Sequence, residues 1–199
     1  MRPLPRLLAI ADDRIVATED FPIKTAAIAS AGPLVGIVVR APSVPAADQL
    51  KLLRRVRALV RPPEAAFLAH GDPALGAASE AHGLELPAGG LSPAEARLVF
   101  RTGRIGVSVR SMAEAEIATN AGADFLVAGP VFRATGLGLE SLRHIVQLGI
   151  PVFAIGGIGV EQIGPVRQTG AWGVAAGSAL WHSADPARAA DQFARALAP

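Results

Sequence analysis

The chain has 199 residues, of which 51% are hydrophobic and 18% charged, and its mean hydropathy is +0.38. This composition excludes a disordered chain and predicts one globular domain over residues 1–199. Charged residues, Gly or Pro interrupt every apolar stretch before the roughly 18 residues of a membrane-spanning helix, and the run at residues 7–11 is too short for a secretory signal. We therefore expect a soluble, cytoplasmic protein without a membrane partner.

The absence of cysteine excludes disulfides, thiolate nucleophiles and cysteine metal sites. The four histidines lack the spacing of a metal site, so no zinc site is predicted: they are His70, His82, His144 and His182. The net charge is only +2 although the pI is 9.9, because a chain without Tyr or Cys has few groups that titrate between the histidines and the two lysines. The arginines of residues 54–61 are expected on a solvated helix face, so a nucleic-acid partner is not favoured.

Short apolar runs alternate with longer segments of helical period along the chain. Strands are predicted at residues 7–11, 34–39, 65–69, 83–86, 105–108, 125–128, 152–155 and 173–176. Repeated strand–helix pairs without a linker predict an α/β protein, a single (β/α)₈ TIM barrel. The alternative is an open doubly wound sheet, but the first strand is followed by residues 11–14, which contain none of the glycines of its phosphate loop.

The helices between these strands carry recognisable start and stop signals. Ser43 is expected to open a helix that runs to Arg61. Ser92 begins a capping box with Pro at the next position, and Ser111 repeats the box for a helix that ends near Gly122. The last helix is predicted over residues 185–198.

The glycine-rich segments after the last two predicted strands indicate a phosphate site. In a TIM barrel the ligand lies at the carboxyl ends of the strands, and the loops after strands seven and eight often hold phosphate. Gly156 and Gly157 follow the seventh strand, and Gly177 and Ser178 follow the eighth. Their unhindered backbone N–H groups can approach an anion, so we expect a small-molecule phosphate ester there.

Four segments carry a resemblance to a known family: residues 105–111, 121–132, 150–158 and 174–179. They resemble, in order, segments of the thiamine phosphate synthase and thiazole tautomerase (TenI) superfamily. The resemblance is continuous over about residues 104–182 and weaker but traceable upstream. The chain is identified as a divergent member of this superfamily.

The resemblance implies a phosphate-binding barrel of thiamine biosynthesis that acts on a thiazole phosphate or a similar phosphorylated heterocycle. The synthase joins a pyrimidine diphosphate to a thiazole phosphate with Mg²⁺, and in this chain Arg40 and Ser108 would face the diphosphate. The resemblance favours a thiamine phosphate synthase-like transferase, with a thiazole tautomerase-like isomerase as the alternative enzyme. The third hypothesis is a non-catalytic member that binds a phosphate ligand without the magnesium–diphosphate site. Whether the protein forms a homodimer is an open alternative at this point.

The sequence departs from the family pattern where metal and acid/base groups are expected. His70 or Gly71 and Gly90 occupy the positions of the metal carboxylates, so no metal is predicted unless a shifted loop brings in Asp72. Magnesium is therefore expected only if synthase activity is retained. The tautomerase histidine is replaced by Pro130, and most cationic groups for a diphosphate are expected to be missing.

Other residues near the predicted strand ends supply candidate acid/base groups. Arg40, His70 and Glu85 follow or end strands two, three and four, so their side chains are expected to converge opposite the phosphate loops. Arg40 would hold Glu85 ionised unless burial counteracts it. Asp12 and Asp13 are interpreted as a helix cap and a solvated charge.

Overall fold

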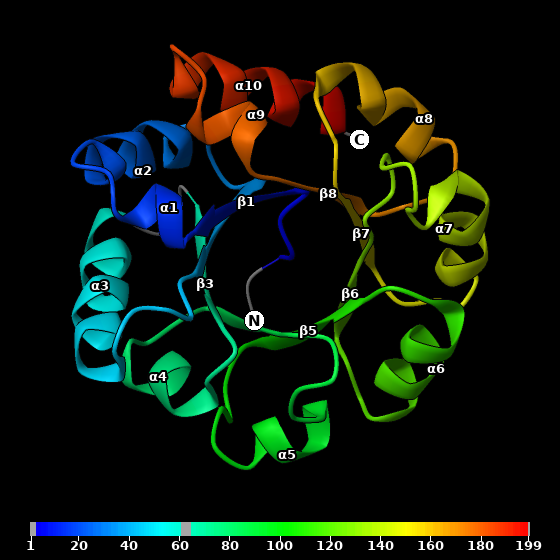
Figure 1. The fold of residues 1–199 in the computed structure, drawn as a ribbon, viewed down its shortest axis with the longest axis horizontal. Helices are drawn as coiled ribbons and strands as arrows, with labels where there is room; N and C mark the ends of the chain where they lie inside the picture. The colour runs from blue at the N-terminus through cyan, green and yellow to red at the C-terminus, as the bar shows by residue number, and fades with distance from the viewer. Residues whose placement is uncertain (1–2, 61–64, 199) are drawn as a thin grey trace.

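Parallel strands connected by helices close into a barrel in the computed structural model, which describes residues 3–60 and 65–198 (Figure 1). Each strand pairs with the next one in the chain, and β8 pairs with β1. The predicted (β/α)₈ TIM barrel is confirmed. The strands are β1 (Leu7–Asp12), β2 (Val35–Arg40), β3 (Ala66–His70), β4 (Gly83–Leu86), β5 (Arg104–Val109), β6 (Phe125–Ala128), β7 (Val152–Ile155) and β8 (Gly173–Ala176).

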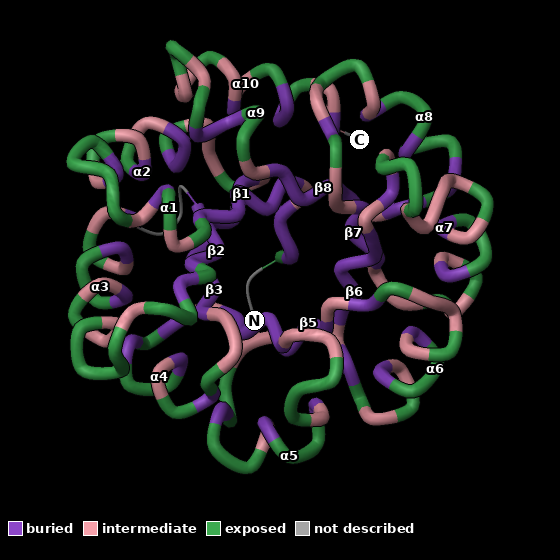
Figure 2. Tube along the Cα trace, in the orientation of Figure 1, coloured by how far each residue is buried: buried purple, intermediate pink, exposed green. Residues whose placement is uncertain are grey.

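The helices form a ring outside the barrel, and their exposed sides face away from the strands (Figure 2). A 3₁₀ turn, η1 (Val160–Gln162), precedes α8. The helices are α1 (Asp13–Val16), α2 (Phe21–Ala29), α3 (Ala46–Leu59), α4 (Pro73–Ala78), α5 (Pro93–Arg97), α6 (Met112–Asn120), α7 (Gly138–Val146), α8 (Ile163–Arg167), α9 (Ser178–Trp181) and α10 (Pro186–Leu197). Every helix in the described ranges is too short or too polar to span a bilayer.

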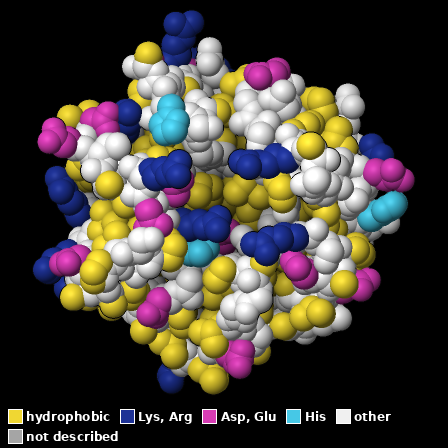
Figure 3. All heavy atoms as spheres, in the orientation of Figure 1, with side chains coloured by type: hydrophobic (Ala, Val, Ile, Leu, Met, Phe, Trp, Pro, Cys, Tyr) yellow, Lys and Arg dark blue, Asp and Glu magenta, His cyan; other side chains and the backbone are white. Residues whose placement is uncertain are grey.

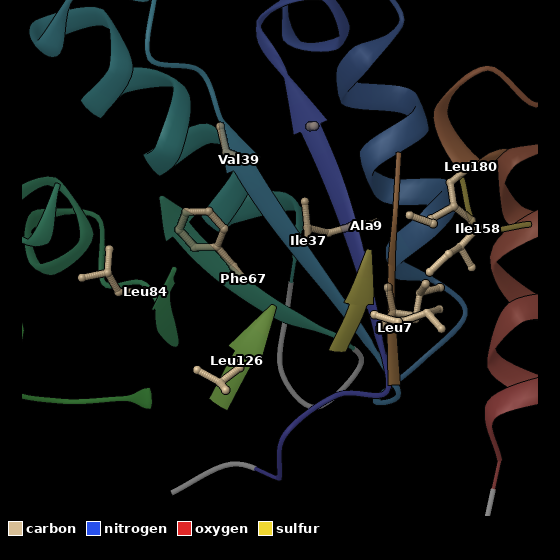
Figure 4. Packing of buried hydrophobic residues seen from close by; sticks show 14 of the residues in the cluster. Leu7, Ala9, Ile37, Val39, Phe67, Leu84, Leu126, Ile158 and Leu180 are labelled. Atoms are coloured by element: carbon tan, nitrogen blue, oxygen red, sulfur yellow. The ribbon is translucent and has the colours of Figure 1, made fainter. Parts of the chain in front are cut away.

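Two apolar layers hold the fold because successive strand residues point to opposite faces. The inner layer fills the barrel with side chains that include Leu8, Val38 and Leu68, and in it Phe125 meets Phe153 edge to face at 5.6 Å. The outer layer packs the other strand faces against the helices, as Figure 4 shows for residues such as Leu7, Ile37 and Phe67. A filled barrel leaves its carboxyl end as the place for a ligand.

Most of the predicted helix signals have the expected contacts. Ser92 Oγ accepts a hydrogen bond from Glu95 N, and Glu95 Oε2 accepts one from Ser92 N at 2.8 Å. Ser111 caps α6, although the Glu114 carboxylate accepts from Arg110 N in place of Ser111 N. The residue after the α6 cap, Gly122, has a φ of 88°, which fits the predicted end of this helix.

The predicted start of the helix at Ser43 is wrong. Helix α3 begins at Ala46, and Pro45 occupies the cap position without a side-chain hydrogen bond. The Ser43 backbone N and Oγ donate to the Asp13 carboxylate at 3.0 and 3.2 Å, so both groups link the β2–α3 loop to the start of α1. The predicted end at Arg61 lies outside the described residues. Arg54 is exposed on α3, as expected for a solvated face.

Candidate functional site at the carboxyl end of the barrel

Polar residues end three neighbouring strands at the mouth of the barrel. Asp12, Arg40 and His70 are the last residues of β1, β2 and β3. Each follows by two positions a side chain of the inner layer, so strand alternation directs all three toward the mouth. Asp12 is opposite Arg40 in the β1–β2 register, and His70 is opposite Glu85 in the β3–β4 register. The register thus places Arg40, His70 and Glu85 on neighbouring strands at this end of the barrel, although Glu85 lines neither of the cavities described below.

Glu85 and Ser108 form a hydrogen-bonded pair inside the barrel. Ser108 Oγ donates to Glu85 Oε1 at 2.7 Å, while Glu85 Oε2 has no partner among the described residues. Glu85 is only 2% exposed. Burial raises the pKa of Glu85, against smaller lowering effects of the Ser108 hydrogen bond and the Arg40 charge. Burial, the one condition under which Arg40 was not expected to determine the state of Glu85, is therefore the larger effect on its pKa.

His70 is partly buried at the same end. Burial first, and the charge of Arg40 second, lower the pKa of His70 to about 4. The imidazole is therefore neutral near pH 7, and its two ring nitrogens can donate one hydrogen bond and accept another. Because the charge of Arg40 contributes to the lowered pKa of His70, the two side chains share one electrostatic environment.

The glycines after β7 are required by close backbone contacts. Gly156 and Gly157 have φ values of 99° and 72°, which other residues rarely adopt. A Cβ at Gly156 would lie 2.6 Å from Pro130 Cβ, and one at Gly157 would lie 2.8 Å from the carbonyl oxygen of Phe132. The β6–α7 loop is also bonded to the β7 loop, since Phe132 N donates to Gly156 O at 3.0 Å. These glycines therefore fix the wall of the mouth.

Gly177, at the start of α9, has a different reason to be glycine. Its φ of −111° is not in the left-handed region, and the nearest atom to an added Cβ would be Ile10 O at 3.6 Å. The protein interior therefore leaves room for a side chain here. The space beside Gly177 belongs to the mouth cavity.

A cavity of about 910 Å³ opens between the ends of β1, β2, β7 and β8. Figure 3 shows Lys, Arg and His side chains gathered around a hollow at the centre of the ring of helices. The four predicted phosphate residues all line this cavity, together with Arg40, Arg133 and His182. The carboxylates that line the larger cavity are Asp12, Asp13 and Glu161. Asp12 caps α1, as predicted for one of the two aspartates, and the Asp13 carboxylate accepts hydrogen bonds from the exposed Ser43.

A smaller cavity of about 250 Å³ continues the mouth toward β3, β4 and β5. Arg40, His70 and Ser108 line it, whereas Glu85 lies behind Ser108 and lines neither cavity. Arg110 and Arg133 also line it, so this cavity has cationic side chains at positions other than those that the family pattern gives. Arg110 could have been found from the sequence, because it follows the inward-facing Ser108 by two residues.

The carboxylates at the mouth do not fit the magnesium site that the family implies. Asp72 Oδ1 accepts from Ala74 N and Leu75 N at 2.7 and 3.2 Å, so this side chain caps α4, and it lines neither cavity. Gly90 occupies the position at which the family pattern has its second metal-binding carboxylate. Within residues 3–60 and 65–198, no three His, Asp or Glu side chains are grouped as metal ligands.

The fold and the site together define a (β/α)₈ barrel with two neighbouring cavities at the carboxyl ends of its strands. A family model described as thiamine monophosphate synthase matches residues 7–180. The thiamine-phosphate synthase of Moorella thermoacetica is 36% identical over 172 residues, which are 81% of each chain. That of Caldivirga maquilingensis is 35% identical over 99 residues, so the match spans 46% of this chain and 48% of that relative.

A solved structure described as thiamine phosphate pyrophosphorylase from Pyrococcus furiosus has a similar fold. The TM-score is 0.86 and the identity 31%, over 96% of this chain and 95% of that one. The chain belongs to the thiamine monophosphate synthase family. This confirms the resemblance seen in the sequence.

Proposed function

We propose that the barrel binds the phosphate of a thiazole phosphate, or of a similar phosphorylated heterocycle of thiamine biosynthesis, and transfers a proton on its ring without a metal. The phosphate would lie between Gly157 and Ser178, where two loops with little side-chain bulk meet the larger cavity. The ring would extend toward Ser108, because the two cavities join at Arg40, Arg133, Ile155 and Gly156. Family membership supports this class of ligand.

The observation that carries this proposal is the Glu85–Ser108 pair. Ser108 is at the cavity wall and its hydroxyl is 2.7 Å from a buried carboxyl group whose pKa is raised by burial. Ser108 Oγ would give its proton to one ring atom while it takes the proton of Glu85. Transfer of a proton from a different ring atom to Ser108, with return of the Ser108 proton to Glu85, would then complete a tautomerisation. Ser108 is then the catalytic residue that contacts the ligand, and Glu85 acts through it.

Deuterium exchange tests this reaction. The protein is incubated with a thiazole carboxylate phosphate in D₂O with excess EDTA, and NMR follows incorporation of deuterium at the ring. We expect exchange that is slowed about 10²-fold or more by Ser108→Ala, with unchanged affinity for the phosphate ester. Binding without protein-dependent exchange would reject the catalytic proposal in favour of the non-catalytic reading.

A synthase-like transferase is the second candidate, and the three arginines of the smaller cavity favour it. Guanidinium groups can neutralise a departing diphosphate, as such chemistry requires. The test mixes thiazole phosphate and pyrimidine diphosphate with either Mg²⁺ or EDTA and measures diphosphate release. We expect the rate of diphosphate release to be nearly the same with Mg²⁺ and with EDTA. Rapid release that requires Mg²⁺ and is lost in Asp72→Asn would instead establish the synthase reaction with a shifted metal site.

A further inference from the structure

A third cavity, of about 280 Å³, lies between the β4–α5 loop, the outer side of β5 and helix α6. From β5 it is lined by Val107 and Val109, which belong to the outer apolar layer. From α6 it is lined by Ile117 and Ala118, and from the loop by residues 87–91. Helices α5 and α6 are neighbours in the ring outside β5 (Figure 1). We call this space the apolar cavity, because apolar side chains form most of its walls.

The polar side chains at the apolar cavity have partners within the protein. Glu95 Oε2 accepts from Ser92 N and Oγ at 2.8 and 2.7 Å. Glu114 Oε2 accepts from Arg110 N at 2.7 Å, and the Ser108 hydroxyl donates within the buried pair described above. A polar group of a ligand would therefore lose its hydration here without gaining a new side-chain partner. An uncharged, apolar group suits the cavity better.

Two glycines keep side chains out of the apolar cavity on its loop side. Gly89 has a φ of 72°, and Gly90 occupies the position at which the family pattern has a metal-binding carboxylate. An added Cβ at Gly90 would lie 3.0 Å from Pro87 Cγ, whereas nothing lies within 4 Å of one at Gly89. The missing carboxylate thus removes a metal ligand and also leaves this wall of the cavity uncharged.

Two apolar side chains at the apolar cavity are largely exposed to water. Ile117 is 70% exposed and Leu91 is 47% exposed, and both line the cavity. A ligand group that covers them would remove apolar surface from water, which favours binding. An apolar cavity of about 150 Å³ is large enough to bind benzene. The space here is therefore sufficient for an aromatic ring or a branched alkyl group.

The apolar cavity continues the smaller cavity of the mouth. Pro87, Ala88, Ser108 and Val109 line both of them, at the ends of β4 and β5. The heterocycle of the proposed ligand extends toward Ser108. A group attached to the ring on the side of Pro87 and Ala88 would therefore point to the apolar cavity.

We propose that the apolar cavity binds an uncharged apolar substituent of the phosphorylated heterocycle. This inference rests on the proposed function, because that function places the ring toward Ser108. The substrate class is then a phosphate ester whose heterocycle carries a hydrocarbon or aromatic group. The phosphate lies in the larger cavity, the ring in the smaller one and the substituent in the apolar cavity.

Titration calorimetry with two kinds of ligand tests the assignment: thiazole phosphate, and analogues that carry one phenyl group at different ring positions. We expect at least one analogue to bind the wild type about 10-fold or more tighter than thiazole phosphate, because the phenyl group is removed from water. Ile117→Glu should abolish this gain, since the ligand would desolvate the new carboxylate. The same variant should leave the affinity for thiazole phosphate unchanged.

Ile23→Glu is the matched control. Ile23 is a 74% exposed isoleucine of α2 that lines neither the apolar cavity nor the two cavities of the mouth. Its substitution adds the same charge to a helix surface and should change every affinity less than about twofold. Melting temperatures verify that both variants are folded.

Analogues that bind no tighter than thiazole phosphate, or equal losses in Ile117→Glu and Ile23→Glu, would overturn this inference alone. Failure of thiazole phosphate and of every analogue to bind would reject the proposed function together with it. Fluorescence of the uncharged dye N-phenyl-1-naphthylamine distinguishes another source of the apolar group. Dye binding that requires Ile117, without a gain for any analogue, would assign the cavity to a separate molecule and contradict the proposal. A dimer that dissociates only in Ile117→Glu, seen by analytical ultracentrifugation, would assign this face to a second copy of the chain instead.

Discussion

Glu85 owes its chemistry to its surroundings. Its position in β4 is visible in the sequence as a carboxylate within an apolar strand, and an inward-facing carboxylate needs a partner. The partner, Ser108, could not be paired with it from the sequence, because the contact depends on the β4–β5 register, which places Glu85 opposite Gly106. The sequence also could not show that Ser108 separates Glu85 from the cavity.

Replacing Glu85 by Gln tests its role in turnover. We expect Glu85→Gln to lower the exchange rate by about 10²-fold or more, because the amide cannot give its proton to Ser108, while phosphate affinity stays nearly intact. Steady-state rates by NMR and calorimetric affinities measure the two effects. Full activity of the Gln variant would contradict the relay.

His70 should make stability depend on pH. Its pKa is about 4 in the folded protein and near 6.5 in the unfolded chain, so the unfolded chain binds the proton first as the pH falls. Stability that is present above about pH 6.5 is therefore lost progressively toward pH 4, by roughly 2–3 kcal/mol. Urea unfolding at pH 7.5 and 4.5 should show a smaller decrease in His70→Gln. The contribution of Glu85 to the pH dependence is the same in the wild type and in His70→Gln. Equal decreases in the free energy of unfolding of the two proteins would therefore contradict the lowered pKa of His70.

The strands were the most predictable elements. Their cores are short apolar runs buried on both faces, and this pattern does not depend on partners elsewhere in the chain. The polar strand ends were missed, since Asp12, Arg40 and His70 continue the ladder beyond the apolar residues. The start of α3 was misplaced because the groups of Ser43 bond Asp13, 30 positions away in the sequence.

Strand β5 has a glycine that the barrel interior requires. A Cβ at Gly106 would lie 2.1 Å from Phe125 Cε2. Gly106→Ala should therefore destabilise the protein by about 2 kcal/mol or more, through overpacking. Gly164→Ala in α8 is the control: nothing lies within 4 Å of its added Cβ, so its stability should be equal or higher. Urea unfolding compares the two, and a loss of stability for Gly164→Ala alone would contradict the packing.

The glycines after β7 and β8 are expected to differ in role: Gly157 keeps the backbone conformation, whereas Gly177 leaves space for the ligand. Gly177→Val should abolish phosphate-ester binding, because the side chain enters the cavity, with little change in melting temperature. Gly157→Val should lower the melting temperature as well, since its φ is 72° and its Cβ would be 2.8 Å from Phe132 O. Unchanged affinity in Gly177→Val would show that the phosphate site is misplaced.

At the scale of the whole molecule, the barrel brings distant residues to one end. The predicted phosphate loops and the acid/base candidates come from opposite halves of the chain, and they meet because all strands are parallel and their carboxyl ends share the mouth. The sequence could predict this meeting from the strand order. The sequence could not place Arg133 at the smaller cavity, because this residue lies in the β6–α7 loop, where strand alternation gives no direction for a side chain.

The most direct test of the metal-free site is a crystal structure of the protein with thiazole phosphate in the presence of EDTA. The phosphate should lie against Gly157 and Ser178, with the heterocycle directed toward Ser108 and no cation between the ligand and the protein. A ligand bound only when Mg²⁺ is added, with the metal held by Asp72, would contradict the account.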